Sequence, residues 1–387
     1  MNIVINAIPL LSTQTGVGNC IFNISHSLLK LDKVNRYTFY YGYYSTRLQS
    51  SQEPGNLDNE VKFITLQRSK SMIKKIPFLG ELSKSVIERY NNALSRKMNF
   101  DVYYEPNYIP SGIHAKHLVT TVHDLSFHHH PEWHPDDRVK YFKRTFFPRV
   151  LKSDVITTDS HFIKQEVVNE LGIAPDRVRV IYMGYDQSLF KVYPAAEVEA
   201  FRASRKLPKK FILFVGSIEP RKNLERLLIA YLQLPEAEKR ECKLVLSGFA
   251  GWKNSAIMNL IQKAHEHVIF LGYLSVHELA LLYNAATIFA YPSLYEGFGL
   301  PPIEAMACGT PVLVSRAASL PEVCGDAALY CDPLEVDQIS SQLQKLFFDE
   351  GLQKRLVETG FQKIRNYTWD KSAEQLLQLF REISGRP

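Results

Sequence analysis

The chain has 387 residues, of which 45% are hydrophobic and 22% charged, and this ordinary composition and length predict two folded domains rather than one. A formal net charge of +6 fits any anionic partner, so it does not choose among sugar nucleotides, phospholipid and nucleic acid. Five cysteines, an odd number in a long chain, favour reduced thiols and a cytoplasmic setting.

The N-terminal residues are typical of structure rather than of a targeting signal. "MNIVINAIPL" has no basic leading region and predicts a first buried strand. The longest uncharged stretch, "LALLYNAATIFAYPSLY", contains Asn284, Thr287 and Pro292, and it predicts a helix followed by a buried strand rather than a membrane span. We expect a cytoplasmic protein, with contact to the inner face of the cell membrane left open.

Strands and helices alternate along the chain. "MNIVINAI", a polar turn and "CIFNISHSLLKL" read as strand, loop and helix, and so do "KFILFVGS", "IEPRKN" and "LERLLIAYLQL". Between these units lie the predicted strands "HLVTTVHDL" and "VITTDS" and the helix "HFIKQEVVNELG". The same rhythm resumes after residue 240, which indicates two α/β units with parallel sheets.

A linker is predicted over residues 185–208, which are polar and lack a strong apolar period. We expect an N-terminal Rossmann-like domain over 1–190, a C-terminal one over 191–365, and a final helix within 366–387 that packs back on the first domain. The fold class is therefore α/β, with two doubly wound domains facing each other across a cleft. Such clefts, at the carboxyl ends of parallel strands, are where open α/β sheets bind ligands.

The segment "YEGFGLPPIEAMACGTPV" holds two carboxylates, Glu296 and Glu304, around a glycine-rich turn. Pro301 or Pro302 suits the first turn of a helix, which places Glu304 in that turn. The backbone N–H groups after Gly299 favour an anion, so the carboxylates are expected to face ribose or sugar hydroxyls instead. A helix-dipole carboxylate and a solvated loop residue explain the same spacing about as well.

Several separated motifs resemble the family 4 glycosyltransferases of the GT-B fold. "EGFGLPPIEAMACGTPV" resembles the family signature, with two glutamates separated by seven residues, and "FVGSIEPRKNL" resembles its phosphate-binding strand and loop. "SLPEVCGDAALYCDP", "HDLSFHHHPEWHP" and "TGVGN" also fit. Because these motifs run through both domains in the expected order, the resemblance implies an acceptor-binding N-terminal domain and a nucleotide-sugar-binding C-terminal domain.

The resemblance also implies roles for single residues. Glu296 would hold hydroxyls of the donor sugar, and Glu304 would bind the nucleotide ribose. Lys222 and Arg221 would bind the diphosphate, and His123 would lie over the donor sugar on the acceptor side. A buried histidine at a strand end explains His123 as an alternative.

Further donor-binding positions follow from the same resemblance: Gly16, Gly18, Ser217, Tyr273, Leu274, Phe298, Gly299 and Leu300. The two N-terminal glycines would let the first loop approach the donor without a Cβ in the way, and residues 298–300 would offer backbone amides. Many family members have an arginine where this chain has Ser217, so the positive charge must come from Arg221 and Lys222.

The expected chemistry is glycosyl transfer with retention of configuration. Oxocarbenium character develops at the anomeric carbon and negative charge on the leaving diphosphate, and fixed cations and amides stabilise that charge. The sequence has no Asp-x-Asp motif, so we expect metal-independent catalysis without a cofactor. Three adjacent histidines in "FHHHPEWHP" cannot all face one ion on a regular strand or helix, which disfavours a metal site there.

A basic segment over residues 68–97 mixes cations with apolar side chains. This composition suits an anionic membrane surface as well as it suits an ordinary solvated helix face. The residues are Arg68, Lys70, Met72, Ile73, Lys74, Lys75, Ile76, Phe78, Leu79, Lys84, Arg89, Arg96 and Lys97.

Within the family, "GSIEPRKN" and "HDLSFHHHPEWHP" most resemble mannosyltransferases of bacterial surface polysaccharide such as O-antigen. GDP-mannose is therefore the preferred donor, the acceptor a saccharide or lipid-linked saccharide, and no nucleic acid is expected. Three alternatives stay open: a UDP- or dTDP-sugar donor, an epimerase on the same fold, and a non-catalytic scaffold that binds sugar nucleotides.

Overall fold

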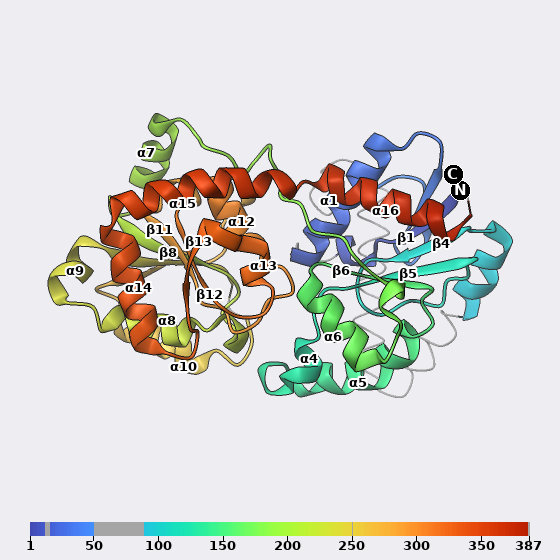
Figure 1. The fold of residues 1–387 in the computed structure, drawn as a ribbon, viewed down its shortest axis with the longest axis horizontal. Helices are drawn as coiled ribbons and strands as arrows, with labels where there is room; N and C mark the ends of the chain where they lie inside the picture. The colour runs from blue at the N-terminus through green and yellow to red at the C-terminus, as the bar shows by residue number, and fades with distance from the viewer. Residues whose placement is uncertain (12–15, 50–88, 250, 386–387) are drawn as a thin grey trace.

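The computed structural model describes residues 1–11, 16–49, 89–249 and 251–385. Two β-sheets form the framework of this part of the chain, one in each half (Figure 1). Helices cover both faces of these sheets. Most strand residues are therefore buried, as expected for parallel sheets between helical layers.

The N-terminal sheet has the strand order β3-β2-β1-β4-β5-β6-β7. Its strands pair in parallel except β2 with β3, which is antiparallel. The strands are β1 (Asn2–Asn6), β2 (Arg36–Tyr40), β3 (Tyr44–Ser45), β4 (Val102–Glu105), β5 (His117–Val122), β6 (Val155–Thr158) and β7 (Val178–Val180).

The C-terminal sheet has the order β10-β9-β8-β11-β12-β13, and all of its pairs are parallel. Because β8 lies between β9 and β11, the strand order reverses direction at β8. The strands are β8 (Phe211–Val215), β9 (Lys243–Ser247), β10 (Val268–Phe270), β11 (Ile288–Tyr291), β12 (Val312–Ser315) and β13 (Ala328–Cys331).

Most helices connect one strand to the next across the face of a sheet, which is the doubly wound arrangement that the sequence predicts. Besides the helical residues 89–98, the described α-helices are α1 (Gly16–Leu31), α4 (Ser126–His129), α5 (Asp136–Val150), α6 (His161–Leu171), α7 (Ala195–Ser204), α8 (Leu224–Leu232), α9 (Glu236–Glu241), α10 (Ser255–Lys263), α11 (Val276–Ala285), α12 (Leu300–Ala307), α13 (Leu320–Cys324), α14 (Val336–Phe348), α15 (Glu350–Lys363) and α16 (Trp369–Ile383). The 3-10 turns are η1 (Ile8–Leu11), η2 (Pro131–Trp133), η3 (Pro175–Arg177), η4 (Pro220–Lys222), η5 (Gly325–Ala327) and η6 (Ile364–Asn366).

Three sequence predictions about helices are wrong in detail. Helix α1 begins at Gly16, four residues before the predicted start, so both N-terminal glycines lie in its first turn rather than in a loop. Helix α7 lies inside the predicted linker, where only Val198 and Phe201 of the helix are buried. Helix α12 begins at Leu300, so Glu304 is its fifth residue and lies outside the first turn.

The chain crosses between the halves twice, near Gly184 and again before α16. Tyr185 forms a parallel bridge with Thr368, and a Cβ on Gly184 would lie 2.2 Å from the backbone nitrogen of Trp369, so the crossings lie in contact. Helix α16 then packs beside α1 on the N-terminal half (Figure 1), where Phe380 joins the hydrophobic cluster of the N-terminal sheet.

In the part of the chain that the structure describes, none of the helices combines the length and the apolar character that crossing a bilayer requires.

Candidate active site

The candidate site lies at the reversal of the C-terminal sheet, where β8 and β11 are neighbours. The loop after β8 forms η4 and carries Arg221 and Lys222, and the loop after β11 carries Glu296. The carboxyl ends of parallel strands that diverge in this way leave a crevice for a ligand. The fold thus brings together the three side chains to which the resemblance assigns sugar and diphosphate contacts.

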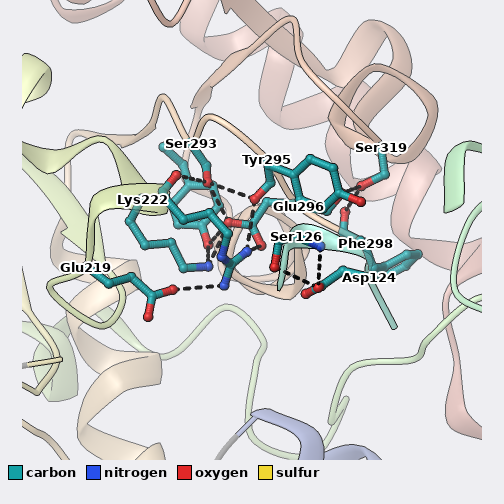
Figure 2. Close-up of polar contacts among 12 residues, drawn as sticks. Asp124, Ser126, Glu219, Lys222, Ser293, Tyr295, Glu296, Phe298 and Ser319 are labelled. Carbon is teal, nitrogen blue, oxygen red and sulfur yellow. Dashed lines mark hydrogen bonds and ion pairs between the residues drawn. The ribbon is translucent and has the colours of Figure 1, made fainter. Parts of the chain in front are cut away.

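Glu296 forms a buried ion-pair cluster with these two cations (Figure 2). Its Oε2 accepts a hydrogen bond from Nη1 of Arg221 at 2.9 Å, and its Oε1 accepts one from Nζ of Lys222 at 2.6 Å. The hydroxyls of Tyr291 and Ser293 also donate to Oε1, at 2.8 and 2.6 Å. The side chain of Glu296 is 8% exposed, so this carboxylate is satisfied entirely by its neighbours.

Charge decides the ionisation state of this carboxylate. Burial opposes ionisation, but the charges of Arg221 and Lys222 outweigh it and hold the pKa of Glu296 down to about 2. Burial and the nearby charge of Arg221 lower the pKa of Lys222, although Glu296 acts in the opposite direction. The cluster is therefore an anion between two buried cations, and neutralisation is the reason that it can exist away from water.

Arg221 bonds to two further groups of the C-terminal half and interacts electrostatically with the N-terminal half. Its Nη2 donates to Glu219 at 2.9 Å, and its Nη1 also donates to the carbonyl of Tyr295 at 2.9 Å. Asp124, in the N-terminal half, is also affected by the positive charge of Arg221. Burial opposes the ionisation of Asp124, but Arg221 and hydrogen bonds from Ser126 lower its pKa. Figure 2 shows Asp124 and Ser126 beside the cluster.

Glu304 lies on α12 in a different environment. It is half-buried, and the hydroxyl of Tyr283 donates to its Oε2 at 3.2 Å. Burial raises the pKa of Glu304 to about 7, because a single hydroxyl does not replace the lost water. A helix dipole would lower this pKa, so burial outweighs any dipole effect on Glu304.

The raised pKa predicts that donor binding depends on pH through Glu304. Its folded pKa lies above the ordinary value, so it contributes stability that is present below about 4.5 and is lost as pH rises through about 7. If the ionised form accepts ribose hydroxyls, affinity for GDP-mannose should rise about fivefold between pH 6 and 8, since hydrogen bonds to charged groups are the stronger ones. Calorimetric titration measures this change. Glu304→Gln should remove it, and an equal pH dependence in the variant would rule the role out.

The N-terminus of α12 offers free backbone donors beside Glu296. Gly299 has a φ of +101° and precedes the helix, and Pro301 and Pro302 occupy its first turn. Within the described part of the chain, the amides of Phe298, Gly299 and Leu300 donate no hydrogen bond. Such amides favour an anion.

The loop that bears Glu296 is fixed by Ser319. The Oγ of Ser319 lies 2.8 Å from the carbonyl of Glu296 and 3.0 Å from that of Phe298 (Figure 2). The ring of Phe298 is buried edge-on against Tyr367, at 5.3 Å between centroids. The amides of this loop are thus held in place before any ligand binds.

His123 follows β5 on the facing sheet, with both ring nitrogens engaged. Nε2 lies 2.9 Å from the carbonyl of Pro106, which can only accept, so Nε2 carries a proton. Nδ1 lies 2.7 Å from Oδ2 of Asp159; burial lowers the pKa of His123, but Asp159 outweighs it and raises that pKa. We infer a protonated ring that donates from both nitrogens. The part of His123 that lies against Gly297 is its carbonyl oxygen, only 1.8 Å from where a Cβ on Gly297 would be.

Tyr295 anchors the Glu296 loop in the N-terminal half. It is buried in the hydrophobic cluster formed by α5, α6 and neighbouring residues. Its hydroxyl donates to the carboxylate of Glu166 and accepts from the amide of Leu125 at 3.2 Å, and burial raises the pKa of Glu166 to about 7. The position of Glu296 therefore depends on contact between the two halves.

Glu322, on α13, makes a second contact between the halves. Its Oε1 accepts from the amide of His161 at 2.8 Å and its Oε2 from that of Phe162 at 3.0 Å, at the start of α6. The hydroxyl of Tyr182 donates to Oε1 at 2.8 Å. A carboxylate at a helix N-terminus is favoured by the free amides and by the helix dipole, so Glu322 holds the halves together.

Glu322→Gln should therefore favour separation of the halves. Hydrogen bonds to a charged acceptor are worth about 1.5–3 kcal/mol each, so the ratio of molecules with the halves in contact to molecules with the halves apart should fall about tenfold or more. Small-angle scattering without ligand should give a larger radius of gyration. The matched control is Glu225→Gln, an exposed residue of α8. Equal radii in wild type and Glu322→Gln would contradict this role.

The remaining predicted donor-binding residues differ in exposure. Gly16 is exposed and an added Cβ would meet nothing within 4 Å, whereas Gly18 is buried in α1. Ser217 is half-buried in the loop after β8. Leu274 is buried and Tyr273 is 57% exposed, just before Ser275 caps α11.

A cavity lies on the N-terminal side of the crevice. It is lined by residues from α1, the ends of β4–β6, the first crossing segment and α16, among them Cys20, Tyr104, His123, Asp159 and Trp369. The cavity therefore reaches the His123–Asp159 pair from within the N-terminal half.

The three adjacent histidines lie beside three carboxylates, and His128 and His129 both approach Glu170. His128 pairs with Glu170 at 3.0 Å, His129 approaches Glu166 at 3.7 Å, and His130 lies 3.3 Å from Glu132. Among the described residues, no group of three or more histidine, cysteine, aspartate or glutamate side chains is arranged to hold a metal ion.

Most of the basic segment over residues 68–97 lies outside the described residues. Its last part, from residue 89 onward, begins a helix that runs to residue 98. Arg89, Arg96 and Lys97 are exposed on that helix.

Family models match both halves of the chain. Residues 16–189 match the model described as Glycosyltransferase Family 4, and residues 197–363 match Glycosyl transferases group 1. The chain belongs to the family 4 glycosyltransferases. It is an enzyme of the hexosyltransferase class, as the sequence predicts.

Individual relatives agree with this assignment. The chain is 29% identical over 384 residues to an O-antigen chain mannosyltransferase B of Escherichia coli, covering 98% of this chain and all of that protein. It is 32% identical over 237 residues to the serotype-specific mannosyltransferase WbdA of E. coli, covering 60% of this chain and 29% of that protein.

A solved structure confirms the GT-B fold of this glycosyltransferase. Anabaena HepE, crystallised in complex with UDP and glucose, superposes with a TM-score of 0.65 at 17% identity, covering 99% of this chain and all of that one.

Sequence reasoning missed several residues of the site. Tyr291 and Ser293 precede the signature, and Asp124 and Ser126 lie inside the "HDLSF" motif. Because these four residues lie in or next to recognised motifs, their position in the sequence could have identified them as site candidates. Tyr295 is quoted in the signature segment, but nothing local indicates that its ring enters the other half.

Proposed function

We propose that this glycosyltransferase transfers mannose from GDP-mannose, with retention of configuration and without a metal ion, to a saccharide acceptor in surface polysaccharide synthesis. The observation that carries this proposal is the buried cluster of Glu296 with Arg221 and Lys222 at the β8–β11 crevice. It supplies two fixed cations for a diphosphate and one carboxylate for sugar hydroxyls.

The cluster also implies how donor binding proceeds. In the structure, Arg221 and Lys222 are both paired with the carboxylate of Glu296. We propose that the diphosphate takes over both cations, together with the free amides of α12, and that Glu296 is thereby released to accept hydrogen bonds from the donor sugar. The cations and amides then stabilise the charge on the leaving diphosphate, as preorganised donors do. We propose that Glu304 accepts hydrogen bonds from the ribose hydroxyls.

Mannose as the transferred sugar is supported by the full-length similarity to an O-antigen mannosyltransferase. A UDP-sugar donor is the second candidate, because a protein of the same fold was solved with UDP and glucose. Contact with an anionic membrane is a further expectation, which the basic segment over residues 68–97 motivates.

Nucleotide release from GDP-mannose, UDP-glucose, UDP-N-acetylglucosamine and dTDP-rhamnose, with methyl α-mannoside as acceptor and with or without EDTA, tests the proposal. Fastest release from GDP-mannose, unchanged by EDTA, is expected. Faster release from a UDP-sugar would show that GDP-mannose is not the preferred donor. Loss of activity with EDTA would contradict the proposal that no metal ion is needed. If none of these nucleotides changes the thermal stability or is released, the scaffold alternative gains support.

A further inference from the structure

His134 carries a buried nitrogen without a partner. The residue follows η2 on the N-terminal half and is 4% exposed, and its ring lies 6.1 Å from that of Trp252, centroid to centroid. Within the described part of the chain, Nδ1 of His134 has no hydrogen-bond partner. A buried polar atom without a partner is rare in native proteins and calls for an explanation.

The neighbours of His134 fix its tautomer. Ser126 has one hydroxyl proton and donates it to Oδ1 of Asp124 at 2.8 Å. Ser126 Oγ must then accept from the ring of His134, whose Nε2 lies 2.9 Å away, so Nε2 carries the proton. Burial, followed by the charge of Arg138, lowers the pKa of His134, which keeps the ring neutral. Nδ1 is therefore a bare acceptor.

A bare acceptor selects the chemistry of its ligand. A phosphate oxygen brings no proton and would be repelled, whereas a hydroxyl brings the donor that Nδ1 lacks. The nitrogen lies close to the candidate site, because Asp124, at the other end of this chain of hydrogen bonds, interacts with the charge of Arg221. In the proposed function, Glu296 already accepts hydrogen bonds from the hydroxyls of the donor sugar, so the hydroxyl at His134 is assigned to the acceptor sugar.

We propose that Nδ1 of His134 accepts a hydrogen bond from a hydroxyl of the saccharide acceptor. This inference rests on the proposed function and adds an acceptor-binding residue to it. The indole of Trp252, from the loop after β9, donates to the carbonyl of Trp133 at 2.6 Å and lies beside the His134 ring. Acceptor entry requires this contact between the halves to open.

Two substitutions separate the two nitrogens of the ring. His134→Gln places an amide near Nε2 and can keep the bond to Ser126, but it removes the acceptor at Nδ1. His134→Asn places an oxygen near Nδ1 instead. His265→Gln is the matched control, at an exposed site whose ring bonds to the carbonyl of Gln262 in its own turn.

Transfer from GDP-mannose is measured with methyl α-mannoside and its 2-, 3-, 4- and 6-deoxy analogues, each rate taken relative to hydrolysis by the same variant. Wild type should use one deoxy analogue about tenfold less well than the parent sugar, the value of one hydrogen bond. His134→Gln should use the parent sugar and that deoxy analogue at equal rates. His134→Asn should keep part of the rate difference between them. An unchanged pattern in His134→Gln overturns the inference.

Nitrogen-15 NMR of the wild-type imidazole provides a second measurement, which needs no turnover. Nδ1 should be unprotonated, and its resonance should shift when methyl α-mannoside is added with GDP. A protonated Nδ1, or one that the sugar does not shift, overturns the inference. Failure of the proposed function appears separately, as no GDP release by wild type from GDP-mannose.

Discussion

Replacing Glu296 with glutamine should lower transfer from GDP-mannose by about 10²–10³-fold, the usual cost of removing one preorganised polar contact to the reacting sugar or leaving group. The amide keeps the shape of the carboxylate and can still accept a hydrogen bond from Ser293. It cannot neutralise Arg221 and Lys222. Initial rates of GDP release measure the effect.

Glu296→Gln should also destabilise the fold. Removing one partner of a buried ion pair costs about 3–5 kcal/mol, because Lys222 then stays buried without its carboxylate, while Arg221 keeps its bond to Glu219. The pKa of Glu296 is depressed to about 2, so its contribution is present above its ordinary value of 4.5 and is lost as pH falls through about 2. Urea unfolding at pH 7 should therefore show the loss, and the difference from wild type should shrink as pH falls below 4.5. Glu225→Gln is the control, and equal unfolding free energies at pH 7 would contradict the account.

Lys222→Met is expected to have the second large effect. Nζ of Lys222 bonds to Glu296 at 2.6 Å and to the hydroxyl of Tyr291 at 2.5 Å, and it is 5.1 Å from the centre of the Tyr291 ring. Methionine fills a similar volume without charge, so transfer should fall by about 10²–10³-fold. Affinity for GDP should fall as well, since the diphosphate loses a cation.

Lys222→Arg should not restore wild-type activity, because a planar fork does not fit a buried site shaped for a point charge. The exposed Lys263 of α10 provides the control substitution to methionine. Calorimetry with GDP and rates with GDP-mannose together measure the effect. Wild-type affinity and rate in Lys222→Met would remove this residue from the site.

The sequence was sufficient to predict the fold, whereas the site roles of the residues on the loops after β8 and β11 come from the resemblance and stay predictions. Alternating strands and helices indicate parallel sheets, and the carboxyl ends of such strands meet at one edge, so Arg221, Lys222 and Glu296 had to be near one another. What the sequence could not show is that these three bond to each other. The pattern of residues within one loop does not indicate which polar groups on another loop its side chains will bond to.

The differences have physical causes that lie between distant residues. Helix α7 has a weak apolar pattern because only Val198 and Phe201 are buried, so its polar residues resemble those of a linker. Glu304 was placed one turn too early because either proline could open the helix, and the left-handed φ of Gly299 sets the start at Leu300.

The contacts between the two halves could not be predicted from the sequence either. Tyr295 enters the hydrophobic cluster of the N-terminal half, although it directly precedes Glu296. Glu322 occupies the start of α6, more than 150 residues earlier in the chain. Neither contact follows from a period or a motif, because each depends on how the two sheets face one another.

Calorimetric titration of GDP into wild type and Glu296→Gln tests the central claim most directly. GDP contains the diphosphate without the sugar, so it isolates the exchange of partners at Arg221 and Lys222. The account predicts tighter GDP binding by the variant, because the carboxylate that competes for both cations is gone, although transfer is slow. Equal or weaker GDP binding by Glu296→Gln would contradict it.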